Sequence, residues 1–177
     1  RSLSSVYGSQ KNYPEAINQL NHALATKALP YGATQKAQLT LGQFYLANKQ
    51  QDKAFAILEP WLKRNPKPSP KTAILLANLF NQKQQYDKAL PLVKKAVAAT
   101  ENPPKAWTEL QLALGYKVKD YSAAITILET SLKQEPDNKA LWKQLSTAYH
   151  NAENYPKAAN IKHLAYQRGF LETEGEL

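Results

Sequence analysis

The sequence predicts an all-α fold: a right-handed superhelical solenoid of stacked antiparallel helix hairpins, with about ten helices. Three observations predict it. A short polar tetrad followed by alanine recurs about every 35 residues, a pattern of large and small residues recurs upstream of each alanine, and prolines fall at the borders between these units. A period of this length is typical of hairpins that bury their apolar faces only by stacking on their neighbours.

The downstream half of each unit predicts a second helix. Its alanines are spaced 38, 35, 35 and 34 residues apart, at Ala16, Ala54, Ala89, Ala124 and Ala158. Seven residues later, on the same helical face, come Ala23, Trp61, Ala96, Ser131 and Ala165. Mostly small residues at both positions let two helices approach closely, as a hairpin requires.

The upstream half predicts a first helix. Its most complete form is Trp142-x-x-Leu145-Ser146-x-x-Tyr149, and it recurs as Leu41-Gly42-x-x-Tyr45, Leu76-Ala77-x-x-Phe80 and Trp107-x-x-Leu110-Gln111-x-x-Leu114. In this alignment the fourth unit has an extra residue around Lys117 to Lys119. We expect Leu76 and Leu145 to be buried between helices.

These patterns resemble the tetratricopeptide repeat, whose signature is Trp, Leu, a small residue and Tyr on a first helix, and Ala with a bulky apolar residue on a second. The resemblance covers the whole chain. It implies a single solenoid over residues 1–177, with a partial unit at 1–30, units at about 31–68, 69–103, 104–137 and 138–171, and the start of a further helix at 172–177. It implies a scaffold for protein–protein interaction and no enzyme.

Prolines and capping residues agree with these borders. Pro14 and Pro156 are expected in the first turn of a helix, where a missing N–H is harmless, and Asp137 or Asn138 can cap the helix that carries Trp142. Two prolines, Pro60 and Pro91, fall inside second helices. We expect a bend near Pro60.

The sequence offers no catalytic, cofactor-binding or metal-binding residues. It has no cysteine, its three histidines are scattered without a second ligand at metal spacing, and its glycines form no phosphate-binding loop. No run of eighteen apolar residues occurs, so no membrane span is predicted. A small-molecule substrate is not expected. Since the chain opens at Arg1 and lacks methionine, we expect it to be part of a longer protein.

The positive charge is uneven. The formal net charge is +9, and residues 1–100 hold 14 Lys/Arg against 4 Asp/Glu, whereas residues 101–177 hold 9 against 10. This asymmetry favours an acidic partner, an anionic surface or nucleic acid, although lysines that only solvate helix faces explain it too. Most tyrosines are accounted for by repeat packing and arginines number only three, so a nucleic-acid-binding helical repeat is kept as an alternative.

First helices line the concave side of such a solenoid, and their residues not used in packing face a groove. Amide, hydroxyl and lysine side chains there suit an extended peptide, which offers one donor and one acceptor per residue. The candidate groove residues are Lys36, Gln43, Lys71, Asn78, Asn81, Gln82, Lys105, Thr108, Tyr116, Lys143, Thr147 and His150. A groove that is merely solvated is the other interpretation.

A narrower resemblance rests on Glu101-Asn102-Pro103-Pro104-x-x-Trp107, Lys119-Asp120-Tyr121, Trp142-x-x-Leu145 and Ala165-Tyr166-x-x-Gly169-Phe170-Leu171. Residues 60–177 resemble the repeat proteins encoded beside TonB, ExbB and ExbD in Gram-negative bacteria. The resemblance implies a periplasmic adaptor in energy-coupled iron transport, with TonB, ExbB or ExbD components as partners. Two alternatives stay open: an architectural spacer, and a peptide-binding module of another envelope assembly.

Overall fold

The computed structural model describes residues 12–171, and within them the chain forms nine α-helices and no strand. The predicted all-α repeat fold is therefore confirmed. The chain divides into two compact units, residues 1–69 and 70–177. That one solenoid runs through both units stays a prediction. Residues 1–11 of the partial unit and the helix start expected at 172–177 lie outside the described residues.

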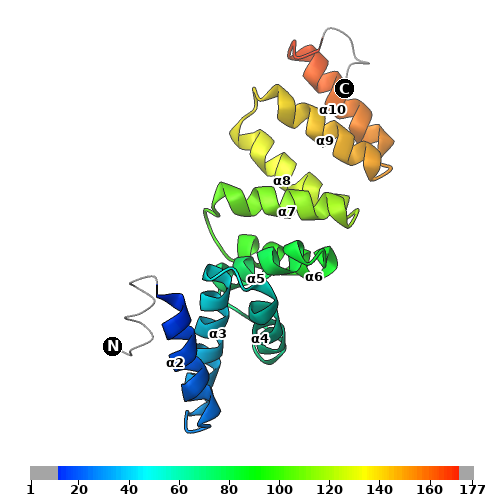
Figure 1. Ribbon diagram of the computed structural model, residues 1–177. Helices are drawn as coiled ribbons and strands as arrows, with labels where there is room; N and C mark the ends of the chain where they lie inside the picture. The colour runs from blue at the N-terminus through cyan, green and yellow to red at the C-terminus, as the bar shows by residue number, and fades with distance from the viewer. Residues whose placement is uncertain (1–11, 172–177) are drawn as a thin grey trace. The chain divides into compact units, whose positions relative to one another are not determined.

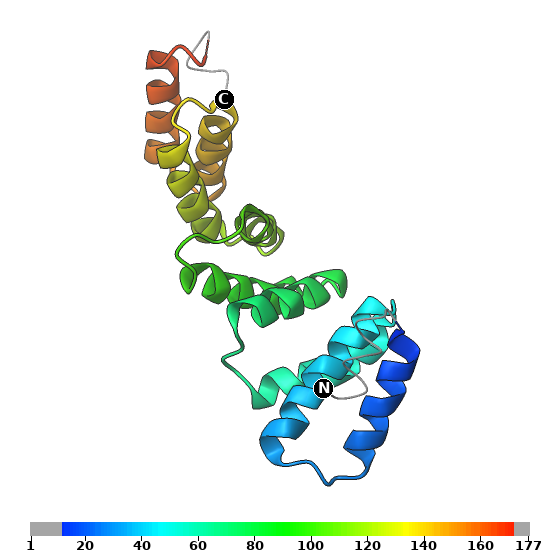
Figure 2. The same cartoon turned by 90° about the vertical axis from the view of Figure 1, so that its left-hand side faces the viewer.

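The first unit contains three helices, α2 (Tyr13–Ala25), α3 (Tyr31–Ala47) and α4 (Gln51–Arg64). Helix α3 packs against both others, and Figure 2 shows α2 and α3 joined by a short loop. Gly42 on α3 allows the close approach to α4, because a Cβ built there would lie 2.5 Å from the Leu58 side chain. Leu58 itself is fully buried.

The second unit contains three hairpins: α5 (Pro70–Gln82) with α6 (Tyr86–Ala98), α7 (Lys105–Lys117) with α8 (Tyr121–Gln134), and α9 (Lys139–Asn151) with α10 (Tyr155–Gln167). Each helix packs on its neighbour in the sequence, both within a hairpin and from one hairpin to the next (Figure 1). Sequential stacking of this kind is the property that makes a repeat protein.

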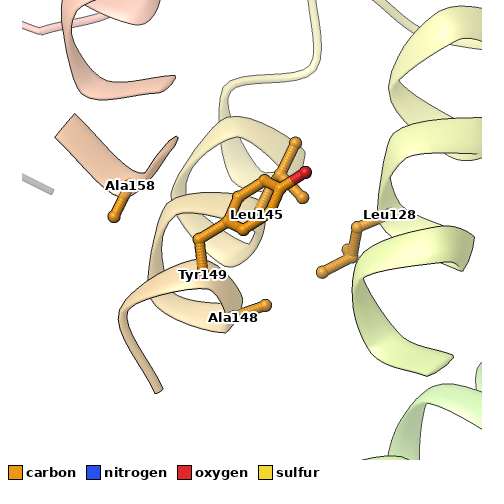
Figure 3. Close-up of a cluster of buried hydrophobic side chains, with 5 residues drawn as sticks. All are labelled: Leu128, Leu145, Ala148, Tyr149 and Ala158. Carbon is orange, nitrogen blue, oxygen red and sulfur yellow. The ribbon is translucent and has the colours of Figure 1, made fainter. Parts of the chain in front are cut away.

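The predicted first-helix residues form the core between layers. Leu76 and Leu145 are each 1% exposed, which confirms their expected burial. Figure 3 shows Leu145, Ala148 and Tyr149 of α9 beside Leu128 of α8, with Ala158 of α10 on the other side. The large and small residues of the sequence pattern thus pack against one another where α9 contacts α8 and where it contacts α10.

The hairpin loops share one geometry. In each of four loops the residue before the second helix's cap has a positive φ, at Lys49 (59°), Gln84 (58°), Lys119 (57°) and Glu153 (58°). The following N–H donates to a carbonyl five residues back, as from Asp120 to Gly115 and from Asn154 to Tyr149, both at 2.9 Å. This pair of features is the Schellman arrangement that ends a helix.

The common loop geometry corrects the alignment of the fourth unit. The loop after α7 is as long as the others, so the extra residue expected around Lys117 to Lys119 is wrong. Counted back from the loop, Gln111 takes the place of Leu145 and Gly115 that of Tyr149. The sequence motif gave the wrong alignment because Trp107 and Leu114 match its apolar spacing but lie one residue before the equivalent positions.

Helix ends follow the predicted signals. Asn138 accepts a hydrogen bond from Ala140 N–H at 3.1 Å and caps α9, and both Pro14 and Pro156 lie in a first turn. Helices α4 and α6 continue through Pro60 and Pro91, whose side chains are exposed. The bend expected near Pro60 stays a prediction.

The residues of the narrower resemblance have a packing role at the end of the second unit. Gly169 has a φ of +73° and turns the chain after α10. This turn places the Phe170 ring 6.2 Å from Trp142 and buries Leu171 against Trp142 and Ala165. These side chains close the apolar core between α9 and α10.

Candidate protein-binding surface

The first helices α5 and α9 expose one side while burying the other. Leu76, Ala77 and Phe80 of α5 are buried, whereas Lys71, Asn78 and Gln82 are exposed. Because these three are spaced seven and four residues apart, they lie along one stripe of the helix. One side of α5 therefore packs into the core, and the opposite side faces solvent.

All twelve candidate groove residues reach the surface at least in part. Nine are exposed, and Asn81, Thr108 and Tyr116 are half-buried. Lys36 and Gln43 belong to α3 in the first unit, and the other ten belong to the second unit. Their exposure permits a binding role without testing one, so the groove stays a prediction.

The loop-based alignment changes which residues are equivalent. The carbonyls that accept the loop hydrogen bond belong to Tyr45 on α3 and Phe80 on α5. Lys36 and Lys71 lie nine residues before these carbonyls, and Gln43 and Asn78 lie two residues before them, so the two pairs are equivalent. On α7 the same positions hold Ala106 and Ala113, both exposed. The predicted Lys105 precedes Ala106 by one residue. Thr108 lies seven residues before the Gly115 carbonyl, a position that the buried Ala73 holds on α5.

The polar row is therefore interrupted at α7. On α9 the same positions hold the exposed Ala140 and Thr147, and the predicted Lys143 lies three residues after Ala140. The two threonine hydroxyls, Thr108 and Thr147, donate to carbonyls of their own helices at 2.8 and 3.0 Å. Their oxygens remain available as acceptors.

Aromatic pairs stand at the loop end of this surface. The Tyr116 ring lies edge-on to Tyr121 with centroids 6.0 Å apart, and His150 lies edge-on to Tyr155 at 5.2 Å. Both pairs join the end of a first helix to the start of the second. Burial, and then the neighbouring Tyr121, raise the pKa of the Tyr116 hydroxyl, which keeps it a hydrogen-bond donor.

The sequence did not reveal these aromatic pairs, although a signal existed. Tyr86, Tyr121 and Tyr155 recur at intervals of 35 and 34 residues, each at the start of a second helix. Repeat packing alone does not account for them, because Tyr155 is 55% exposed. Lys117 lies 5.5 Å from the centre of the Tyr86 ring and links one hairpin to the next at the same end.

A further set of cations packs on aromatic rings inside the hairpins. Lys53, Lys88 and Lys157 lie 5.3 to 5.8 Å from the centres of Tyr45, Phe80 and Tyr149, always at the same repeat position. In the fourth unit both partners are absent, because Gly115 and Ala123 occupy these positions. Part of the positive charge is thus engaged in cation–π contacts.

Residues 12–171 contain neither a metal-ligand cluster nor a membrane-spanning helix. No cluster of three or more His, Asp or Glu side chains in that range could hold a metal ion. None of its helices has both the length and the apolar composition that crossing a bilayer demands.

Comparison with known proteins supports the fold. Residues 116–161 match the family model described as tetratricopeptide repeat. A sequence search of curated proteins gave no match.

Solved structures with the same fold cover nearly the whole chain. The structure of Naa15/Naa10 bound to HypK-THB contains a chain with a TM-score of 0.65 and 20% identity, over 96% of this chain and 25% of that one. A MamA mutant gives 0.61 and 20%, over 94% and 88%. A tetratricopeptide repeat protein from Parabacteroides merdae gives 0.56 and 16%, over 93% and 62%.

At these identities the structural matches establish the fold alone. This chain spans about a quarter of the Naa15/Naa10 chain and just under two thirds of the Parabacteroides chain. The chain therefore has the fold of solved tetratricopeptide repeat structures, and its residues 116–161 match the tetratricopeptide repeat model.

Proposed function

We propose that this protein is a scaffold that binds an extended segment of another protein along its first helices. The observation that carries the proposal is the exposed stripe of Lys71, Asn78 and Gln82 on α5, directly opposite that helix's buried face. Amides can pair with a peptide backbone and lysine with its carboxylates. The Naa15/Naa10 structure, which has HypK-THB bound, is a precedent for partner binding by a protein of this fold.

The test is a double variant on this stripe. Lys71→Glu with Asn78→Ala should weaken partner capture from the native source at least several-fold, while helical content and melting temperature stay within error. Both side chains are exposed, so the fold loses little. The matched control is Lys95→Glu with Asn102→Ala, which makes the same two changes at exposed positions away from the first helices. Equal capture by both double variants would refute the groove.

We further propose, from the resemblance of residues 60–177, that the protein works in the periplasm with TonB, ExbB or ExbD in iron transport. Cross-linking in cells followed by affinity purification should recover at least one of these components. Recovery of cytosolic proteins or RNA instead would overturn both compartment and partner. An architectural spacer would instead recover further copies of the same protein.

Salt dependence separates two modes of contact. The chain carries a net charge of +9, concentrated before residue 100. If that charge attracts an acidic partner, association should weaken as the ionic strength rises and the Debye length falls below about 8 Å. Association that is unchanged between low and high salt would point to apolar contacts.

A further inference from the structure

A second concave feature lies in the second unit, away from the first-helix stripe. It is an open cavity of about 420 Å³ formed by α8, α9 and α10. Its floor is Trp142 and Leu145, which are 5% and 1% exposed, and Ile161 and Leu132 form its half-buried sides. The cavity is therefore apolar at the bottom.

The cavity lies on the other side of α9 from the candidate groove. At about 100° per residue, Trp142 and Leu145 are each roughly 140° or more from Thr147 around the helix. A segment held along Thr147 would not reach the cavity floor, whereas Lys143 lies about 100° from Trp142 around the helix. The two surfaces can thus be tested independently.

Among residues 12–171, the rim of the cavity carries two cations without a carboxylate partner. Lys133 and Arg168 are exposed, and neither forms an ion pair within residues 12–171. The Arg168 guanidinium lies 5.1 Å from the centre of the Trp142 ring. The carboxylate of Glu129, also on the rim, accepts a hydrogen bond from the Tyr149 hydroxyl.

The floor is held in place by a hydrogen bond. Trp142 Nε1 donates to the carbonyl of Pro136 at 2.8 Å, so the polar edge of the indole is satisfied and its apolar surface is left for packing. An occupant of this site needs an apolar group for the floor and a negative charge for the rim. An aliphatic side chain close to a carboxylate meets both needs.

We propose that this cavity is a second docking site, which takes an acidic segment of a partner protein with an aliphatic side chain beside a glutamate or aspartate. The choice of a protein segment follows from the exposure of the rim. Pockets for small molecules enclose roughly 70–90% of their ligand. Here Glu129, Lys133, Pro136 and Arg168, half of the lining residues, are exposed, which suits a side chain projecting from a larger partner.

The three tryptophans provide a direct test. A ¹⁵N-labelled sample should show three indole N–H resonances, of which the Trp142 signal is assigned with a Trp142→Phe variant. The probe is the capped tetrapeptide Glu-Leu-Leu-Glu, titrated to millimolar concentration. We expect the Trp142 signal to shift while those of Trp61 and Trp107 stay in place. The capped peptides Gln-Leu-Leu-Gln and Glu-Ser-Ser-Glu should each bind at least about fivefold more weakly. The first lacks the negative charge and the second lacks the aliphatic side chains.

Charge reversal at the rim supplies the matched comparison. Lys133→Glu should weaken Glu-Leu-Leu-Glu binding about fivefold or more, whereas Lys139→Glu, an exposed lysine outside the cavity, should leave it unchanged. Equal weakening by both variants would mean that only net charge matters and would overturn the site.

Three further results would also overturn the proposal. One is a Trp142 signal that no peptide shifts. Another is an equal shift produced by octanoate, which would make the cavity a site for small amphiphiles. The third is a shift on raising the protein concentration alone, which would place a second copy of the chain in the cavity.

Discussion

Replacing Gln111 by leucine should stabilise the second unit. Gln111 is 6% exposed, and its side-chain oxygen has no hydrogen-bond partner within residues 12–171. The equivalent positions of the other hairpins hold Leu41, Leu76 and Leu145, each 1% exposed. The wild-type residue therefore places a polar group where the repeat otherwise places an aliphatic one.

The size of the effect follows from the burial of that oxygen. Leaving a buried acceptor unsatisfied costs about 1–3 kcal/mol, and leucine restores apolar burial in a similar volume. We expect Gln111→Leu to raise the free energy of unfolding by about 1–3 kcal/mol. At roughly 2–4 °C per kcal/mol for a chain of this size, the melting temperature should rise by about 2–12 °C.

The control is the other buried glutamine. Gln35 is 9% exposed, but its side-chain oxygen accepts a hydrogen bond from Asn65 Nδ2 at 2.8 Å. Gln35→Leu therefore removes an existing hydrogen bond and should lower the free energy of unfolding. Thermal and urea unfolding followed by circular dichroism measure both, and amide exchange in α7 shows whether the gain is local. A melting temperature that falls or stays constant in Gln111→Leu would refute the loop-based alignment of α7.

Four other substitutions test separate parts of the structure. Leu76→Ala and Leu145→Ala should each cost about 2–5 kcal/mol in the same unfolding experiments, and losses under about 0.5 kcal/mol at both would contradict their burial. Gly42→Ala should destabilise the first unit by about 1 kcal/mol or more despite alanine's higher helix propensity, because its Cβ would lie 2.5 Å from the buried Leu58; a more stable variant would show that Leu58 can move aside. Burial, followed by the contact with Glu129, raises the pKa of Tyr149 from 10.0 to about 12. The folded state then holds this proton more tightly than the unfolded state, so the stabilisation is complete below about pH 10 and lost as the pH rises towards 12. Tyr149→Phe should show a smaller loss of stability over that pH range, and parallel curves for the two proteins would argue against the contact.

The sequence alone determined the repeat and its buried face. Alanines at nearly constant spacing and the Leu-small-x-x-aromatic pattern were enough to place second helices, first helices and the burial of Leu76 and Leu145. These features depend on helical periodicity and on side-chain size, both of which are local properties of the chain. For the same reason the Asn138 cap and the first-turn positions of Pro14 and Pro156 were predictable.

Tertiary structure decided what depends on position between helices. The fourth unit could not be aligned correctly from its apolar pattern, because Trp107 and Leu114 imitate the motif and only the hydrogen bond from Asp120 to Gly115 fixes the count. The missing partner of Gln111, the aromatic pairs at the loops and the cavity over Trp142 likewise arise from side chains on different helices. One-dimensional spacing constrains each helix separately, whereas burial, hydrogen-bond satisfaction and cavity shape are set by how neighbouring helices pack.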